Sequence, residues 1–447
     1  MENLFTWEDL ADVTRGEWLN FATLREGILN ISTDTRTIVE GDLFLALVGE
    51  RFDGHEFIDT AIENGASAVL VSRPIEATVP TLVVNDTLCA YHRLARYHRK
   101  RFPALLTVGI TGSSGKTSSK EIIASVMRRH FGADYVLITE GNTNNQIGVP
   151  QNLLRLREHH RCAILEMGTN MPGEIEILRS LVCPNIAVLT NIGPVHLEGL
   201  GDLDGVAREK SAIFAGAQLA ILPAEYAELP IVAGQLPALV MRTGFSSTVD
   251  VQVELLSSNL HGSSFATYQD GCRAEVSWKL HGQHMAMNAA AAFAIGKHLF
   301  LDNKLLCKAL SECEIPGMRM RISEHDGVTW INDAYNANPD SMRALIDWLV
   351  EVVDDSRQIR LVLGDMLELG PDSIQYHQDL LTCAKRRLPD AMIIGVGPCM
   401  AEAGKGLDVT AFPGTEEASP ALRSELPVGA IVALKGSRGM ALEQLVP

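Results

Sequence analysis

The stretch ALLTVGITGSSGKTSSKEIIASVMRRH, residues 104–130, decides the fold class. Residues 104–110 are an apolar run that predicts a buried strand, and residues 116–130 have the composition and spacing of a helix. A glycine-rich turn joins them, made of Thr111, Gly112, Ser113, Ser114, Gly115, Lys116 and Thr117. Glycines let backbone N–H groups point at phosphate oxygens, and the helix N-terminus adds a positive dipole. The stretch therefore predicts a phosphate-binding loop within an α/β domain.

The loop departs by one position from the strict pattern G-x-x-x-x-G-K-[ST]. That pattern asks for glycine at the position of Ile110, whereas Gly109 comes one residue earlier. We expect Lys116 to reach the β- and γ-phosphates of a nucleotide and the Thr117 hydroxyl to bind Mg²⁺. The alternative is a tight glycine-rich turn that carries a surface lysine. The strand before the loop and the helix after it favour the phosphate loop.

Outward from this loop, the chain divides into three predicted α/β units. The first, residues 1–84, has strand candidates at 41–47, 66–72 and 79–84 and a helix at 57–65. The second, residues 85–315, opens with a helix at 86–102 and has continuous apolar strands at 104–110, 162–167, 186–192 and 219–223. Strands of this kind are typical of a parallel sheet covered on both faces.

The remaining chain changes pattern and then returns to alternating strands and helices. Asp270-Gly271 and Asp326-Gly327 each separate two alternating runs, which predicts two hairpins. A helix is expected at 285–300 between them. The third unit, residues 316–447, has strands at 359–364, 391–397 and 430–436 between helices at 341–353 and 373–387. Each unit is therefore expected to be an open α/β sheet.

Composition and charge exclude several function classes. The 447 residues are 46% hydrophobic and 21% charged, which is ordinary for a globular protein. The net charge of −17 repels phosphate backbones, so nucleic-acid and anionic-membrane binding are not expected. No apolar stretch reaches the roughly 18 residues of a membrane span, and the start of the chain does not resemble a signal peptide. The eight scattered cysteines are interpreted as reduced thiols of a cytoplasmic protein.

Polar residues follow two of the predicted central strands. Glu166 ends the strand 162–167, where a carboxylate can bind a hard cation at the ligand-binding edge of a parallel sheet. His196 follows the next strand and is either a second group near that cation or a structural histidine. Lys210 lies in a charged helical run, and from spacing alone it is a solvated surface residue. Asn288 enters an alanine-rich helix, where it is either exposed or faces a purine.

These residues and their motifs together resemble the Mur ligase family. The resemblance covers essentially the whole chain and rests on TGSSGKT (111–117), LEMG (165–168), TNIGPVH (190–196), EKSAIF (209–214) and NDAYNANPDSM (332–342). It also includes STDTR (32–36), LGDMLELG (363–370) and LKGSRGM (434–440). Several long motifs in the same order are far more specific than any one of them. The resemblance implies a central ATP-binding domain between an N-terminal UDP-substrate domain and a Rossmann-like C-terminal domain that closes over ATP.

The resemblance also implies a reaction. The carboxylate of a UDP-N-acetylmuramoyl-tripeptide attacks the γ-phosphorus of ATP, and the amine of D-alanyl-D-alanine then attacks the resulting acyl phosphate. ADP, phosphate and a UDP-muramoyl-pentapeptide for peptidoglycan synthesis are the expected products. Fixed cations help this chemistry, because two anions must approach each other. We expect a monomer.

Site roles follow from the same resemblance. Residues Thr111–Thr117 would bind the ATP phosphates. Thr117 and Glu166 would hold one Mg²⁺; Glu166, His196 and Lys210 would serve a second, with Lys210 carbamylated by CO₂. Asn288 would contact adenine, and Arg319 and Asp333 would contact the nucleotide from the C-terminal side. Arg319 is chosen over the neighbouring Arg321, and Met285 stands where the family often has asparagine.

Substrate residues are assigned from the same motifs. Arg36, with Asp34 and Thr35, is a candidate for the UDP-sugar, since a guanidinium can pair bidentately with a diphosphate; the alternative is a surface arginine. Asn144 and Asn145 either border the cleft or form an ordinary turn. The incoming dipeptide carboxylate or phosphate is assigned to Lys435, Ser437 and Arg438.

Two other functions remain open at this point. One is a sibling Mur ligase that adds the third peptide residue, or a folylpolyglutamate-type ligase, although NDAYNANP and KGSR disfavour both. The other is a P-loop small-molecule kinase or a nucleotide-switch regulator, which would explain the loop but leave the third domain unused.

Overall fold

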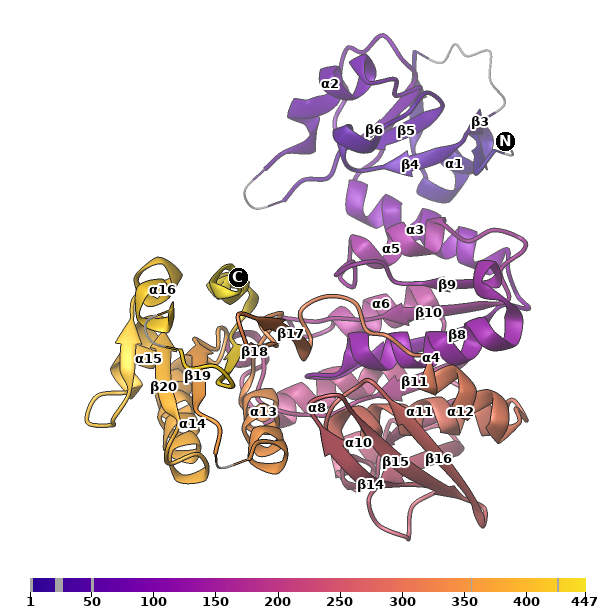
Figure 1. Ribbon diagram of the computed structural model, residues 1–447. Coiled ribbons are helices and arrows are strands. Elements are labelled where there is room, and N and C mark those ends of the chain that lie inside the picture. Colours follow the sequence, from indigo (N-terminus) through magenta and orange to yellow (C-terminus); the bar gives the residue numbers. More distant parts are fainter. Residues whose placement is uncertain (1–2, 21–26, 50–51, 355, 424–425) are drawn as a thin grey trace.

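A computed structural model describes residues 3–20, 27–49, 52–354, 356–423 and 426–447 of the 447. Within these ranges the chain forms an α/β protein with three main sheets; the N-terminal part lies above the central part, and the C-terminal part lies beside the central part (Figure 1). The expected α/β class is confirmed. No helix among the described residues is long and apolar enough to cross a membrane.

The N-terminal sheet has five short strands in the order β2-β7-β6-β5-β4. Its parallel strands are β4 (Asn30–Ser32), β5 (Asp42–Leu45), β6 (Ala68–Val71) and β7 (Thr81–Val83), while β2 (Glu17–Leu19) pairs antiparallel with β7. The helices of this part are α1 (Trp7–Thr14) and α2 (Ile58–Glu63). A separate pair, β1 (Phe5–Thr6) and β3 (Gly27–Ile28), lies beside them.

The central sheet has nine strands in the order β16-β15-β14-β13-β12-β11-β8-β10-β9. The loop-bearing strand β8 (Leu106–Thr111) lies between β11 (Ile186–Leu189) and β10 (Cys162–Glu166), all parallel. The other strands are β9 (Val136–Ile138), β12 (Leu219–Pro223), β13 (Leu239–Gly244), β14 (Val251–Asn259), β15 (Gly262–Gln269) and β16 (Cys272–Trp278). The carboxyl ends of β8, β10 and β11 therefore meet at one edge.

Helices cover both faces of the central sheet. One face packs on α4 (Lys116–Phe131), α11 (Gln283–His298) and α12 (Asn303–Ser311). Successive side chains of each strand point alternately to this face and to the opposite one. The opposite face packs on α5 (Gly148–Leu154), α6 (Glu174–Val182) and α8 (Leu203–Ser211). The predicted continuous apolar strands are explained by this double covering.

The C-terminal sheet has six strands in the order β17-β18-β22-β19-β20-β21. They are β17 (Arg321–His325), β18 (Val328–Asn332), β19 (Ile359–Gly364), β20 (Met392–Val396), β21 (Thr410–Phe412) and β22 (Ile431–Lys435), with only β17 antiparallel. Helices α13 (Pro339–Val352), α14 (Ser373–Arg387), α15 (Pro398–Ala403) and α16 (Thr415–Arg423) pack on it.

Both predicted hairpins are confirmed. Gln269 pairs with Cys272, and His325 pairs with Val328, so each Asp-Gly pair forms a two-residue turn. All four turn residues have positive φ, as the turns that suit a twisted hairpin require.

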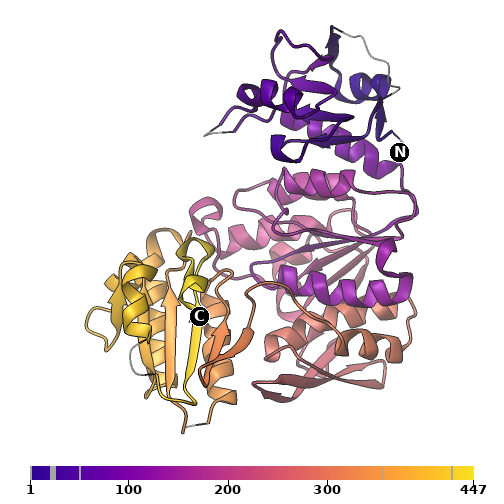
Figure 2. The same cartoon turned by 45° about the horizontal axis from the view of Figure 1, so that its top comes forward.

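Helix α3 (Thr87–Lys100) joins the N-terminal part to the central part and packs against both. Toward the N-terminal part, Arg93 donates to Thr14 O at 2.9 Å and Arg101, the residue that caps the helix, donates to Leu4 O at 2.8 Å. Toward the central part, Arg99 donates to Val182 O at 3.1 Å and His98 Nε2 bonds Leu156 O at 3.0 Å. Both views show the helix between the two parts (Figures 1 and 2).

Candidate active site

The glycine-rich loop runs directly from β8 into α4, as predicted. Gly112 and Gly115 both have positive φ, 153° and 77°. A Cβ on Gly112 would lie 1.9 Å from Thr190 Oγ1, so a side chain there would collide with the neighbouring strand end. Lys116 curls back over the loop and donates from Nζ to Gly112 O at 2.6 Å. The loop thus has the backbone shape and the cation expected for binding phosphate.

Two residues that sequence reasoning left without a role hold the loop in place from β11. Asn191 Oδ1 accepts from Ser114 N at 2.7 Å, and Asn191 O accepts from Ser113 N at 3.1 Å. The Thr190 hydroxyl donates to Ser114 O. Ser113 Oγ also bonds both the N–H and the carbonyl of Gly193. The TNIG sequence after a predicted parallel strand was the available signal for this role.

Glu166 lies beside the loop at the end of β10, with 1% of its surface exposed. Its Oε2 accepts from the Thr117 hydroxyl at 3.1 Å. Its Oε1 is buried without a hydrogen-bond partner among the residues that the structure describes and lies 3.6 Å from Lys120 Nζ, which itself pairs with Glu121 at 3.0 Å. A buried carboxylate oxygen left without a donor is costly, and a bound cation would satisfy it.

Of the two lysines of the site, Lys210 is buried and Lys116 is half-buried. Burial lowers the pKa of Lys116, while the Glu166 carboxylate acts in the opposite direction. Burial and the charge of Lys116 both lower the pKa of Lys210, well below its usual value. Lys210 is 1% exposed, so the interpretation of it as a solvated surface residue is wrong. It sits on the inner face of α8, close enough to Lys116 for their charges to oppose each other.

His196 lies between the central and C-terminal parts. Its Nδ1 bonds Glu368 Oε2, from the loop after β19. Burial lowers the pKa of His196, the Glu368 carboxylate raises it, and the charges of Lys210 and Lys116 lower it. His196 is therefore near both lysines and in contact with the C-terminal part through Glu368, which sequence reasoning missed although it lies in LGDMLELG.

Arg319 reaches the loop from the C-terminal side. Its Nη2 donates to the Thr117 hydroxyl at 3.0 Å, and its guanidinium lies 3.7 Å from the centre of the Tyr335 ring. The neighbouring Arg321 begins β17 instead. Asn338 Nδ2 donates to Ser113 O at 3.4 Å, a second contact from the C-terminal part to the loop.

Asp333 and Lys435 form a buried pair. Lys435 Nζ donates to Asp333 Oδ2 at 2.6 Å and to Asn336 O at 3.0 Å. Asp333 Oδ1 accepts from Met320 N at 3.1 Å, which fixes the chain next to Arg319. His284 lies close to this pair, and burial lowers its pKa to about 4.

Asn288 and Asn144 lie against the loop and the β10 end. A Cβ on Gly115 would lie 2.9 Å from Asn288 Oδ1, and one on Gly168 would lie 2.8 Å from Asn144 Oδ1. Asn288 is half-buried and donates weakly to Met285 Sδ at 3.9 Å. The structure thus brings both asparagines beside the phosphate loop or the carboxylate.

The other predicted site residues make local contacts. Asn145 caps α5 through Ile147 and Gly148. Asp34 pairs with the exposed Arg36, and Thr35 O accepts from Asn64, all within the N-terminal part. Arg438 pairs with Glu443, and the Ser437 hydroxyl accepts from Leu367 N at 2.9 Å.

Comparison with known proteins identifies this arrangement. Models of the Mur ligase family, catalytic domain, of the Mur ligase middle domain and of the Mur ligase, glutamate ligase domain match residues 27–99, 110–296 and 318–438. The UDP-N-acetylmuramoyl-tripeptide–D-alanyl-D-alanine ligase of Bacillus subtilis is 33% identical over 99% of this chain and 97% of its own. The chain belongs to the Mur ligase family.

Further relatives place the Mur ligase chain more narrowly. The Escherichia coli ligase of the same name is 35% identical over 85% of this chain and 83% of its own. Crystal structure I of MurF from Acinetobacter baumannii has a TM-score of 0.90 at 34% identity, covering 99% of this chain and 97% of that one. MurF ligase from Thermotoga maritima, solved with ADP, has a TM-score of 0.81 at 25% identity, covering 93% and 96%. The expected three-domain Mur ligase fold is confirmed.

The residues present fit a divalent cation. Thr117 and Glu166 offer oxygen atoms, which Mg²⁺ prefers, and Glu166 Oε1 is buried without a hydrogen-bond donor. His196 keeps one ring nitrogen beyond the one that bonds Glu368. The donor chemistry therefore suits one cation at Thr117 and Glu166, while His196 and Lys210 are close enough to Lys116 to interact with its charge.

Proposed function

We propose that this Mur ligase joins D-alanyl-D-alanine to UDP-N-acetylmuramoyl-tripeptide, with ATP cleaved to ADP and phosphate, in the synthesis of peptidoglycan precursors. The observation that carries the proposal is the contact of Arg319, from the C-terminal part, with Thr117 of the phosphate loop. This contact brings a nucleotide-binding loop and a second α/β domain to one site, as a ligase needs when a carboxylate first attacks ATP and an amine then attacks the resulting acyl phosphate. The names of the full-length relatives support the choice of substrates.

The chain's own groups account for activation of the carboxylate. Residues 112–117 would hold the ATP phosphates through backbone N–H groups. Lys116 would supply a positive charge; without a nucleotide, its ammonium group donates a hydrogen bond to Gly112 O. Arg319 would add charge from the other side and is held flat against Tyr335. Opposed cations of this kind stabilise the charge that develops as the γ-phosphoryl group moves to the substrate carboxylate. The resulting acyl phosphate is then open to attack by the dipeptide amine.

Thr117 and Glu166 would hold Mg²⁺, and Glu166, His196 and Lys210 would serve a second ion. Bound Mg²⁺ would neutralise phosphate charge and help to fix the γ-phosphoryl group in line. The lowered pKa of Lys210 supports carbamylation, because the uncharged amine is the form that reacts with CO₂. A carbamate would also replace a costly buried cation by an oxygen ligand.

The remaining residues are assigned to the adenine, the UDP-sugar and the dipeptide. Asn288 would border the adenine, and Asp333 would orient the strand end next to Arg319. Asp34, Thr35 and Arg36 would bind the UDP-sugar in the N-terminal domain, with Asn144 and Asn145 at the border of the cleft. Lys435, Ser437 and Arg438 would line the dipeptide end, although Lys435 is already paired with Asp333. A cytoplasmic monomer is the form in which we expect this activity.

The decisive experiment measures both product and phosphate. The full chain is incubated with ATP, Mg²⁺, UDP-N-acetylmuramoyl-tripeptide and a panel of dipeptides, and products are analysed by mass. We expect a pentapeptide product with D-alanyl-D-alanine and phosphate release only when both acceptor and dipeptide are present. A stable phosphorylated product that is released and accumulates over many turnovers without the dipeptide would instead indicate a small-molecule kinase. A product extended by one amino acid would indicate the sibling ligase.

A further inference from the structure

Glu368 of the C-terminal domain contacts the central domain at His196 through both its side chain and its backbone. Glu368 Oε2 bonds His196 Nδ1, and Glu368 O accepts from Leu197 N at 3.0 Å. The two contacts hold adjacent residues of the central domain. Glu368 is therefore held at two points, at its backbone carbonyl by Leu197 N and at its carboxylate by the His196 imidazole.

Both partners have an uncommon backbone conformation. His196 has φ 52° and Glu368 has φ 64°, although neither is glycine. Left-handed conformations of such residues persist where the surroundings over-determine them, and they gather at functional sites. His196 takes this conformation immediately before the short helix α7 (Leu197–Leu200). Two such residues meeting across a domain boundary point to a role for the contact itself.

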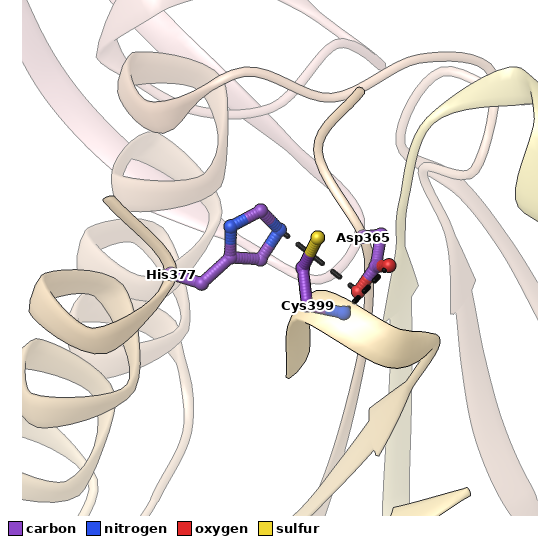
Figure 3. A group of neighbouring side chains, drawn as sticks. All are labelled: Asp365, His377 and Cys399. Carbon is purple, nitrogen blue, oxygen red and sulfur yellow. Dashed lines mark hydrogen bonds and ion pairs between the residues drawn. The ribbon is translucent and has the colours of Figure 1, made fainter. Parts of the chain in front are cut away.

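The segment that carries Glu368 is anchored by a buried cluster of Asp365, His377 and Cys399 (Figure 3). Asp365 accepts from Cys399 N at 3.0 Å and Met400 N at 2.7 Å, at the start of α15. His377 Nε2 accepts from Met366 N at 2.8 Å, and its Nδ1 donates to Ser373 O at 2.7 Å.

This cluster has the residue types of a metal site, but its imidazole has no free nitrogen. Both ring nitrogens of His377 have backbone partners, and each carboxylate oxygen of Asp365 accepts a backbone N–H. A cation bound by His377 would have to displace one of the two imidazole hydrogen bonds. With Ser437 accepting from Leu367 N, the cluster instead fixes the backbone of residues 365–367 directly before Glu368. The LGDMLELG motif thus forms a rigid support for one glutamate.

We propose that Glu368 is a positioning residue for the ligase reaction: it sets the orientation of the His196 imidazole, and it can do so only while the C-terminal domain is docked. An imidazole that donates Nδ1–H to a carboxylate presents Nε2 as the free lone pair, and such partners fix both ring orientation and tautomer. A residue of the C-terminal domain thereby leaves Nε2 of His196 available as a ligand or hydrogen-bond acceptor at the phosphate and metal site. The proposal rests on the proposed function, since it adds a residue to the same site.

Steady-state kinetics of the full-length protein test the proposal. Glu368→Ala should lower kcat about 10- to 100-fold, the usual effect of losing such a partner, and leave KM for the UDP-substrate unchanged. Glu368→Gln should retain most activity, because its amide oxygen can accept the same N–H. Asp372→Ala, an exposed acid on the same segment, is the matched control and should behave as wild type. A Glu368→Ala enzyme with wild-type kcat overturns the proposal.

A double-mutant cycle separates positioning from general destabilisation. If Glu368 acts through His196, Glu368→Ala should cause no further loss in a His196→Ala background. Losses that multiply would show that the two residues act independently and would overturn the proposal. Thermal unfolding of each variant checks folding, and Glu368→Leu, which keeps a side chain of similar size but cannot accept the N–H, carries the comparison if Glu368→Ala proves unstable.

A binding measurement provides a readout without turnover. A non-hydrolysable ATP analogue is titrated by calorimetry with Mg²⁺ and with a chelator. Glu368→Ala should reduce the gain in affinity that Mg²⁺ provides and leave the metal-free affinity unchanged; an unchanged gain overturns the proposal. Wild-type pentapeptide formation, measured separately, tests the proposed function, so failure of one inference is distinguishable from failure of the other.

Discussion

Arg319 donates a hydrogen bond to the Thr117 hydroxyl at 3.0 Å, although 202 positions separate the two residues. The same hydroxyl lies 3.1 Å from Glu166 Oε2. One side chain of the phosphate loop is therefore shared by a carboxylate of the central sheet and a cation of the C-terminal domain. We expect that a nucleotide bound with its cation at Thr117 would change the contact with Arg319 and let the guanidinium bind phosphate.

Arg319→Lys is expected to raise KM for ATP about tenfold, because lysine lacks the planar fork and the stacking on Tyr335 that hold the guanidinium in place. Initial rates at varied ATP measure this effect. Arg321→Lys is the matched control, since Arg321 is exposed on β17. Equal KM values for the two variants would contradict the role assigned to Arg319.

Lys116→Ala should lower kcat by about 10²- to 10³-fold, the usual loss when one group that stabilises a developing charge is removed. The protein should stay folded, because the main partner of Lys116 Nζ is a carbonyl of the loop itself. ADP release in the presence of the tripeptide measures the first step. Turnover close to wild type would exclude Lys116 from phosphoryl transfer.

Glu166→Gln is expected to raise the Mg²⁺ concentration needed for half-maximal activity by about 10-fold or more. The reason is that the buried carboxylate, with Oε1 lacking a hydrogen-bond donor, is the strongest anionic oxygen ligand beside Thr117. A magnesium titration at saturating ATP measures the shift. Glu121→Gln is a suitable control, because Glu121 also pairs with Lys120 but makes no contact with Thr117 among the described bonds. The same midpoint in both variants would speak against a metal at Glu166.

Gly112→Ala should destabilise the protein by about 1–3 kcal/mol, the range for forcing atoms into a filled space. The new Cβ would lie 1.9 Å from Thr190 Oγ1. Gly141 also has positive φ, but a Cβ there meets nothing within 4 Å, so Gly141→Ala carries the backbone strain without the collision. The difference in unfolding temperature between the two variants measures the collision together with the less tolerated φ of 153° at Gly112, compared with 56° at Gly141. If both variants melt together, the close approach of the two strand ends is wrong.

Stability should fall on acidification partly through His98. Burial lowers its pKa from 6.5 to about 4, and its Nε2 bonds Leu156 O. Between these pH values the unfolded chain binds a proton that the folded protein does not, so folding loses up to about 3 kcal/mol as the pH falls through this window. At pH values above 6.5, the pKa of His98 in the unfolded chain, this loss of folding free energy is absent. His98→Gln should show a smaller drop in unfolding temperature from neutral pH to about pH 5; parallel drops would contradict this assignment.

The sequence predicted well those parts of the fold that local pattern determines. The buried strands β8, β10, β11 and β12 are continuous apolar runs, and the Asp-Gly turns require positive φ. Short or half-exposed elements were not predicted, among them β9, β13 and β21. β13 is mostly exposed or half-buried along its length, so it lacks the apolar signal of its parallel neighbours.

The site was predictable where one motif carries the chemistry and unpredictable where two distant segments meet. The phosphate loop and Glu166 follow from their places at strand ends. Burial of Lys210 could not be read from a helix that looks charged, because it depends on which face α8 turns to the sheet. The partner of His196 lies 172 positions away, and no local pattern names it.

Helix α3 has a consequence for how the molecule moves. Its arginines and His98 donate hydrogen bonds to backbone carbonyls of both neighbouring parts. One apolar core also runs through the first two domains. Removing the residues before Ala104 would take away part of that core and expose apolar side chains of the central domain to water, so the central domain is not expected to be stable alone. The N-terminal and central domains are thus joined as a single unit. We therefore expect substrate entry and product release to depend on movement of the C-terminal domain, which carries Arg319.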